Sequence, residues 1–196
     1  MRFASRLFAS TLCGCCLLTA ASSPSLLAQA AAPMAKPTEG TQVSPAATYN
    51  KLLAGMEKEF VDAADAMPED KYSFAPTNGE FKGARTFGQQ VKHVAEANYY
   101  FFGGPGFTEA DDKKMTDSIE KLTSKADIMK ALKDSFAKAH ATIDTMTAEN
   151  AFKLTKTGTP AGMAAFGISH MMDHYGQMVI YLRMNGIVPP ASRGGM

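Results

Sequence analysis

Four long stretches of the chain repeat apolar residues with the spacing of helices that each bury one face. The first begins at Ser44-Pro45, a capping hydroxyl followed by proline, and it ends before Pro68. Its apolar positions are Leu52, Leu53, Met56, Phe60, Ala63, Ala64 and Met67. Because they recur every three or four residues, the pattern predicts a helix over residues 45–67.

The second and third helices begin at equally clear capping residues. Thr86 and Gln89 have the spacing of a capping box, and the run 103–106 of glycine and proline ends the second helix. Ser124 can cap the third helix. The apolar stripes are Phe87, Val91, Val94, Ala95, Tyr99 and Phe102 in the second helix, and Ile128, Leu132, Phe136, Ala139, Ile143 and Met146 in the third.

The fourth helix begins at Thr159-Pro160 and runs to Asn185, before Gly186. It is apolar on most sides, so we expect it to be the most buried of the four. Residues 68–85 are expected to form an ordered loop whose aromatic residues cover a core edge, and residues 111–121 a short helical turn. Four long helices and no convincing strand predict an all-α fold, a four-helix bundle with at least one long crossover.

The first thirty residues have the features of a secretory signal peptide. Arg2 and Arg6 precede an apolar run, and Ala28-Gln29-Ala30 matches a small-x-small cleavage site. A retained membrane anchor and a lipoprotein signal at Leu12-Cys13-Gly14-Cys15 are the alternatives, and both need a longer apolar run than the chain has. The sequence therefore predicts an exported protein, periplasmic or secreted, with lipoprotein anchoring less favoured and no transmembrane segment in the mature chain.

The predicted organisation is a signal peptide over residues 1–30, a flexible linker over 31–44, one domain over 45–190 and a tail over 191–196. All three cysteines, Cys13, Cys15 and Cys16, lie in the signal, so the mature domain has no disulfide, thiolate metal site or cysteine nucleophile. Loss of two arginines leaves 18 basic residues, from 20, against 19 acidic ones. This balance gives no argument for nucleic acid or an anionic membrane as a partner.

Three histidines are the candidate metal ligands. His170 and His174 lie four residues apart, so on a helix both imidazoles project from one face, separated by about 5.4 Å along the axis. His93 lies in the middle of the second helix, and a bundle brings facing helices within side-chain reach. Three imidazoles would leave a coordination position open, as in catalytic zinc sites. We predict one divalent ion, Zn²⁺ or Ni²⁺, with Fe²⁺ and Cu²⁺ also compatible.

Each of these residues also has a structural interpretation. A histidine on an apolar helix face is often a hydrogen-bonded core residue, and a pair four residues apart recurs by chance. His140 is expected at the rim of the third helix, and Met171, Met172 and Met178 are expected to fill the core. Gln177 could orient a ligand or join two helices, and Asp173 could support the site or be merely polar. No motif of a di-iron bundle, a zincin protease or a c-type haem is present.

The domain resembles the DinB-like superfamily over nearly all of residues 46–190. The strongest segments are 67–77, 86–95, 170–177 and the ending 182–190, Leu-Arg-Met-Asn-Gly-Ile-Val-Pro-Pro. The resemblance implies an up-down-down-up bundle with one divalent ion held by His93, His170 and His174, with water completing the coordination. It also implies a possible homodimer. Relatives include thiol-dependent S-transferases, an isomerase and metal-dependent hydrolases, although export departs from the cytoplasmic setting of the transferases.

Two functions from different classes follow from these patterns. The first is an enzyme, a transferase or hydrolase in which the ion activates a bound thiol or water toward an unknown small-molecule substrate. No acidic side chain stands out as its general base, so the catalytic residues stay unassigned. The second is a non-catalytic metal-binding or interaction protein of the cell envelope, in which the ion joins the second helix to the fourth.

Overall fold

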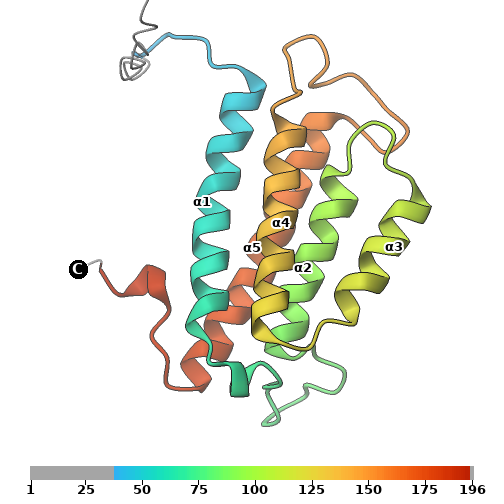
Figure 1. Cartoon of the computed structure of the whole chain (residues 1–196). Helices are drawn as coiled ribbons and strands as arrows, with labels where there is room; N and C mark the ends of the chain where they lie inside the picture. Colours follow the sequence, from blue (N-terminus) through green and yellow to red (C-terminus); the bar gives the residue numbers. More distant parts are fainter. Residues whose placement is uncertain (1–37, 195–196) are drawn as a thin grey trace, which may run out of the picture. The chain divides into compact units, whose positions relative to one another are not determined.

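The computed structural model describes residues 38–194, and within this range the chain is all α-helical. Its elements are α1 (Pro45–Ala66), η1 (Glu69–Lys71), α2 (Phe87–Phe102), α3 (Glu109–Glu120), α4 (Lys125–Ile143), α5 (Pro160–Met184) and η2 (Pro190–Ser192), where η marks a 3₁₀ turn (Figure 1). The all-α prediction is confirmed. The predicted signal peptide, residues 31–37 of the predicted linker and the last two tail residues lie outside the described range.

Residues 38–41 form a turn, in which the Thr41 amide donates to the Thr38 carbonyl. The compact helical unit begins at Gln42. None of the helices in the described range combines the length and apolarity that crossing a bilayer would need.

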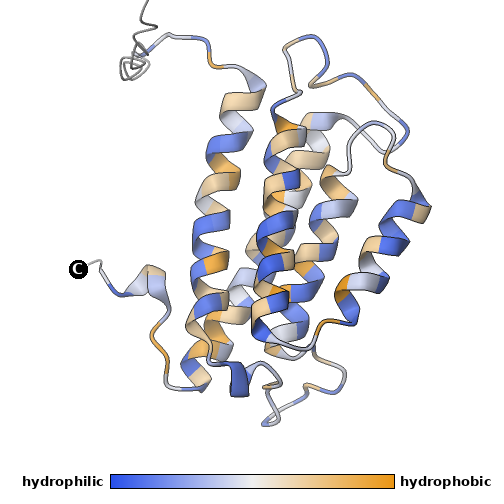
Figure 2. Cartoon of the chain, viewed as in Figure 1, coloured by the Kyte–Doolittle hydropathy of each residue, from blue (hydrophilic) through white to orange (hydrophobic). Residues whose placement is uncertain are grey.

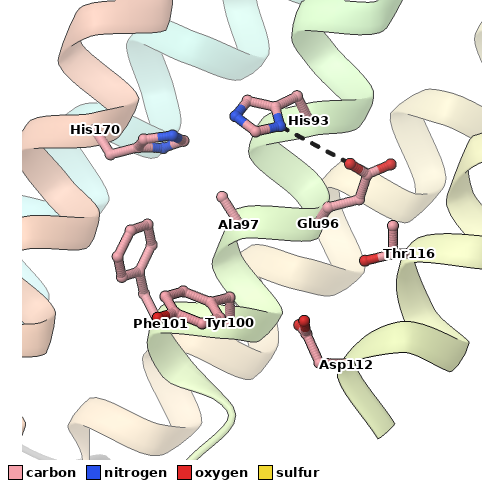
Figure 3. A pocket seen from close by; sticks show the side chains of 8 residues that line it. All are labelled: His93, Glu96, Ala97, Tyr100, Phe101, Asp112, Thr116 and His170. Carbon is pink, nitrogen blue, oxygen red and sulfur yellow. Dashed lines mark ion pairs between the residues drawn. The ribbon is translucent and has the colours of Figure 1, made fainter. Parts of the chain in front are cut away.

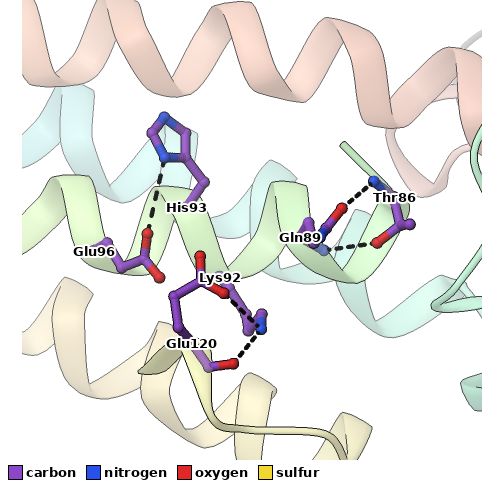
Figure 4. A network of polar contacts seen from close by, with 6 residues as sticks. All are labelled: Thr86, Gln89, Lys92, His93, Glu96 and Glu120. Carbon is purple, nitrogen blue, oxygen red and sulfur yellow. Dashed lines mark hydrogen bonds and ion pairs between the residues drawn. The ribbon is translucent and has the colours of Figure 1, made fainter. Parts of the chain in front are cut away.

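The helices begin where the capping residues predict. The Ser44 hydroxyl accepts a hydrogen bond from the Ala47 amide at 3.1 Å, and the Thr159 hydroxyl accepts one from the Gly162 amide at 3.1 Å. Thr86 and Gln89 form both hydrogen bonds of a capping box, with distances of 3.2 and 2.8 Å (Figure 4). Each bond satisfies an amide that the first helical turn leaves without a partner.

The short turn predicted at residues 111–121 is instead a full helix of 12 residues, α3. A capping box between Thr108 and Asp111 starts it, and acidic residues in its first turn suit the helix dipole. A Lys113–Asp117 ion pair one turn apart adds local support. Ile119 is its one buried residue, so the apolar period that revealed the other helices is missing here.

The helices pack around one core. Helix α1 packs against α4 and α5, α2 packs against the same two helices from the other side, and α3 packs against α2. In Figure 1, α1 and α5 run in one direction and α2 and α4 in the other. The largest fully buried side chains include Phe60, Phe87, Phe102 and Phe136. Hydrophilic residues dominate α3, as Figure 2 shows.

Helix α2 is the most enclosed helix, although the sequence predicts α5. In α2, 11 of 16 residues are buried, against 8 of 25 in α5. The reason is the number of neighbours, because α2 is covered by three helices and α5 by two. The side chains of Phe166, Met172, Ile180 and Met184 therefore leave apolar surface on α5 exposed.

The loop after α1 closes one end of the core, as predicted. Tyr72 is buried, and its hydroxyl donates to the Ala64 carbonyl at 2.8 Å. Phe74 is partly buried and meets the Tyr181 ring edge-on, with ring centroids 5.7 Å apart. These contacts fix the loop between α1 and the start of α2.

Gly167 lets α5 approach α2 closely, one turn before His170. A Cβ atom at this position would lie 2.7 Å from Phe102 Cε2 and 3.1 Å from Phe101 Cβ. Because Phe102 is fully buried and cannot swing away, we expect Gly167→Ala to destabilise the fold by about 1–3 kcal/mol.

Urea unfolding followed by circular dichroism measures this effect. The matched control is Gly176→Ala on the same helix, where an added Cβ meets nothing within 4 Å. The control should raise stability by up to about 1 kcal/mol, since alanine favours the helix. Equal effects of the two substitutions would show that the Gly167–Phe102 contact does not limit the approach of the helices.

Candidate metal centre

The three histidines singled out in the sequence come together between α2 and α5. His93 comes from α2, and His170 and His174 come from successive turns of α5. One ring nitrogen from each lies within 4.8 Å of the others. The ring centroids are 5.1 Å apart for His93 and His170, 4.7 Å for His93 and His174, and 4.5 Å for His170 and His174. The structure therefore brings together all three predicted site residues.

The spacing of these nitrogens fits a single ion. The Nε2 atoms of His170 and His174 are 3.2 Å apart. Two imidazole nitrogens on one tetrahedral Zn²⁺, each bonded at about 2.0–2.1 Å, would be separated by roughly 3.3 Å. Small rotations of the His93 side chain would complete the set, because its ring is already in contact with both others. The donors and their spacing thus fit a borderline divalent metal.

A buried glutamine fixes the orientation of His174. His174 Nδ1 donates to Gln90 Oε1 at 2.6 Å, while Gln90 Nε2 donates to Gln177 Oε1 at 2.8 Å. The proton on Nδ1 leaves the Nε2 lone pair directed at the other histidines. Metal-binding histidines usually donate their second ring N–H in this way. Gln90 was missed in the sequence, although it lies one turn before His93 on the same helix.

The environment keeps the three imidazoles neutral. Burial lowers the pKa of His93 to about 4, with the positive charge of Arg85 contributing next. Burial also lowers the pKa of His174 to about 4, and repulsion from His170 and His93 adds to the effect. For His170 the pKa is likewise lowered, chiefly by burial. All three rings therefore offer lone pairs at neutral pH, the form that a metal requires.

A cavity of about 320 Å³ opens beside the histidines. It lies among α2, α3 and α5, and Figure 3 shows the side chains around it: His93, Glu96, Ala97, Tyr100, Phe101, Asp112, Thr116 and His170. Tyr100, near the end of α2, is one of these lining residues. The cavity gives a small molecule access to two of the three histidines.

Glu96 supplies the acidic group that the sequence did not reveal. It lies three residues after His93 on α2, and its Oε2 is 3.9 Å from His93 Nδ1 (Figure 3). Its other oxygen, Oε1, is buried without a hydrogen-bond partner in the described part of the chain. The pKa of Glu96 is raised to about 7, chiefly by burial and next by the negative charge of Glu120. Its position three residues after His93, on the same face of a helix, was the feature of the sequence that could have indicated this role.

A buried lysine fastens α3 against α2 next to Glu96. Lys92 Nζ donates to the Glu120 carbonyl at 2.7 Å and to Glu120 Oε2 at 3.1 Å (Figure 4). Lys92 is only 8% exposed, and the contacts with Glu120 compensate for the burial of its ammonium group. The contact holds the end of α3 in place, and α3 carries Asp112 and Thr116 into the cavity wall.

Comparison with known families identifies the chain. A model of the DinB superfamily matches residues 52–178, which contain α2, α3, α4 and all three histidines. The chain belongs to the DinB superfamily. A search of curated proteins found no match.

The remaining polar candidates of this DinB-superfamily chain lie outside the histidine cluster. Gln177 takes the interhelical role, through its bond to Gln90, and Asp173 lies on the exposed side of α5 at 3.3 Å from Gln177. His140 lies at the rim, as predicted, where its Nδ1 contacts Asn50 and its Nε2 contacts Glu57.

The three methionines that the sequence analysis placed in the core differ in their burial. Met171 and Met178 are fully buried in the core of this DinB-superfamily domain. Met172 is 53% exposed, so the prediction that it fills the core is wrong. Its position on the α5 face that no described helix covers explains the difference.

Gln90→Leu should lower the metal affinity of this DinB-superfamily protein by about 10–100-fold, the usual cost of losing such a supporting contact. Leucine fills similar space but cannot accept the His174 Nδ1–H. Competition with a chromophoric chelator measures the affinity. Gln90→Glu keeps an acceptor oxygen and should stay within about threefold of the wild type. Equal affinity of the leucine variant and the wild type would rule out this role of Gln90.

Proposed function

We propose that this DinB-superfamily protein is an exported, metal-dependent transferase or hydrolase. One divalent ion, Zn²⁺ or Ni²⁺, is held by His93, His170 and His174 at the end of an open cavity. The observation that carries the proposal is the convergence of three neutral imidazoles, with ring nitrogens within 4.8 Å of one another, beside room for a substrate. Export is supported by the signal-like first thirty residues, and an up-down-down-up bundle by the helix directions in Figure 1.

The residues around the cavity have separate tasks in this proposal. Gln90 holds His174 with its lone pair toward the ion, and the buried histidines stay neutral. When bound, the ion would supply the Lewis acidity that makes a thiol or water nucleophilic near neutral pH. Glu96 is the carboxylate placed to accept the proton that the nucleophile releases, since it lines the same cavity as His93. Tyr100 and Phe101 give the substrate an aromatic wall.

Activity screening tests the enzymatic proposal. Protein purified without an affinity tag is loaded with Zn²⁺ or Ni²⁺ and offered thiols with electrophiles in one panel, and esters and amides in another. We expect turnover in one panel that His174→Ala lowers by at least about 100-fold, as loss of a group acting through the ion would do. No turnover above that of His174→Ala in either panel would count against an enzyme.

A structural ion is the second candidate, because His93 and the α5 histidines would let an ion join α2 to α5. An ion that binds only the folded state stabilises it by mass action, by about 4 kcal/mol at a thousand times its Kd. A chelator should then lower the thermal midpoint in a protein that shows no turnover. A midpoint that the chelator leaves unchanged would exclude the structural role.

A further inference from the structure

Two acidic side chains line the cavity beside the histidines, and neither has a cationic partner in the described cavity wall. Glu96 and Asp112 line it, and no lysine or arginine is among its described lining residues. Glu96 is 9% exposed, and its Oε1 is buried with no hydrogen-bond partner in the described range. Asp112 is partly buried, and within residues 38–194 it enters no side-chain hydrogen bond or ion pair with a cationic residue. A buried acceptor without a donor is costly, so a ligand that donates to it would be favoured.

The nearby cations lie outside the cavity wall. Lys92 is paired with Glu120, and it contacts that residue through both the carboxylate and the backbone carbonyl. Arg85 is exposed and is not part of the cavity wall. The three histidines are neutral. Within the cavity itself, the carboxylates of Glu96 and Asp112 therefore set the sign of the charge.

The aromatic wall suits the same kind of ligand. The rings of Tyr100 and Phe101 meet edge-on with centroids 5.2 Å apart, and Phe101 lies 5.4 Å from the His170 ring. Tyr100 lines the cavity and is 59% exposed, so a ligand can reach its side chain from solvent. Aromatic faces attract ammonium groups, with about 0.5–2 kcal/mol in favourable cases. In Figure 3, Tyr100 lies beside Phe101, and Asp112 lies on α3 at the other side of the view.

We infer that the cavity binds a small ligand that carries a protonated amine. Glu96 and Asp112 accept hydrogen bonds from the ammonium group, Tyr100 offers its ring, and the ligand's anionic donor group points to the histidines. The inference rests on the proposed function in one respect, namely the ion that the three histidines would hold. The charge of the divalent ion suits the anionic end of such a ligand, and the two carboxylates suit its ammonium end. The volume of about 320 Å³ limits the ligand to a small molecule.

Three thiols of equal reach test the charge preference: 2-aminoethanethiol, 2-mercaptoethanol and 3-mercaptopropionate. Each is titrated into Co²⁺-loaded protein at about pH 8, and the cobalt–thiolate absorption band gives the affinity. Each affinity is calculated for the thiolate form, because the three thiols differ in acidity. We expect 2-aminoethanethiol to bind at least about 10-fold more tightly than 3-mercaptopropionate, with 2-mercaptoethanol between them, because charge-assisted hydrogen bonds contribute more than neutral ones. Equal affinities or the reverse order would overturn the inference.

Variants without the two carboxylates show whether Glu96 and Asp112 cause the preference for the amine-bearing thiol. Glu96→Gln with Asp112→Asn keeps the shape of the cavity and should bring the three affinities to within about threefold. The control is Asp117→Asn, which removes an exposed carboxylate of α3 that pairs with Lys113 and lies outside this cavity. The control should keep the full preference. A preference that survives the double variant would contradict the inference.

Failure of the metal site is distinguishable from failure of the inference. A protein that takes up no Co²⁺ contradicts the proposed function. Metal-free protein is then titrated with benzylamine and benzyl alcohol, followed by NMR shifts. Here the inference requires tighter binding of benzylamine, with the difference lost in the double variant. Equal binding of the two probes would overturn the inference whatever the metal result.

Discussion

Replacing His174 with alanine is expected to lower the affinity for Zn²⁺ by at least about 100-fold. Loss of a supporting contact to a ligand already costs about 10–100-fold, so loss of the ligand itself costs more. His174 is 5% exposed, and its ring contacts both other histidines, which makes it the centre of the proposed set. Competition with a chromophoric chelator measures the affinity, and circular dichroism verifies that the variant is folded.

The fourth histidine is the matched control for this experiment. His140 bonds to Asn50 and Glu57 at the interface of α1 and α4, away from the cluster. His140→Ala should keep the Zn²⁺ affinity within about threefold, since no metal ligand is removed. If the two alanine variants lose affinity equally, or neither does, the proposed set of ligands is wrong.

The second large effect is a loss of stability of the metal-free protein as the pH falls. The pKa values of His93 and His174 are lowered to about 4 in the folded protein, from 6.5. Between these values the unfolded chain binds more protons than the folded one, so the free energy of unfolding falls with pH. The contribution of these two histidines to the free energy of unfolding is fully present above about pH 6.5, and it decreases as the pH falls toward 4. We expect a loss on the order of 3 kcal/mol, because a tenfold change in proton affinity corresponds to about 1.4 kcal/mol and the sites are partly exposed.

Glu96 opposes the histidines over part of this range. Its pKa is raised to about 7 from 4.5, so the folded protein binds more protons than the unfolded chain between these values. Its contribution to stability therefore falls as the pH rises from 4.5 to 7, and a Glu96→Gln background should make the histidine effect larger.

Urea unfolding at a series of pH values measures the net effect and its source. His174→Gln should remove part of the pH dependence, because glutamine does not titrate. His140→Gln should retain the pH dependence that the cluster produces. Identical pH profiles of the wild type and His174→Gln would show that burial of the cluster does not control acid stability.

The four long helices could be predicted because the spacing of their apolar residues and their capping residues indicate the same helix boundaries. At Ser44-Pro45 and Thr159-Pro160 a capping hydroxyl, a proline and an apolar stripe all indicate the same start. Helix α3 was underestimated because one buried residue gives no period, and its stability comes from caps and ion pairs. The relative burial of α2 and α5 depends on how many helices cover each, which a pattern within one helix does not contain.

The histidine cluster could be predicted for a related reason. His170 and His174 share a helical face by spacing alone. His93 followed from its place in the middle of the second helix, and the family resemblance indicated the same three residues. Gln90 and Glu96 lie one turn on either side of His93, so the spacing was visible. Their roles depend on partners from α3 and α5, namely His174 for Gln90 and Glu120 for Glu96, and those partners are determined by packing.

X-ray absorption of Zn²⁺-loaded protein, purified without a tag, tests the central claim most directly. The predicted spectrum has one ion per chain with three imidazole nitrogens at about 2.0–2.1 Å and one further light-atom ligand. His93→Ala should lower the imidazole count by one. An ion with only oxygen neighbours, or a spectrum that His93→Ala leaves unchanged, would contradict a site built from His93, His170 and His174.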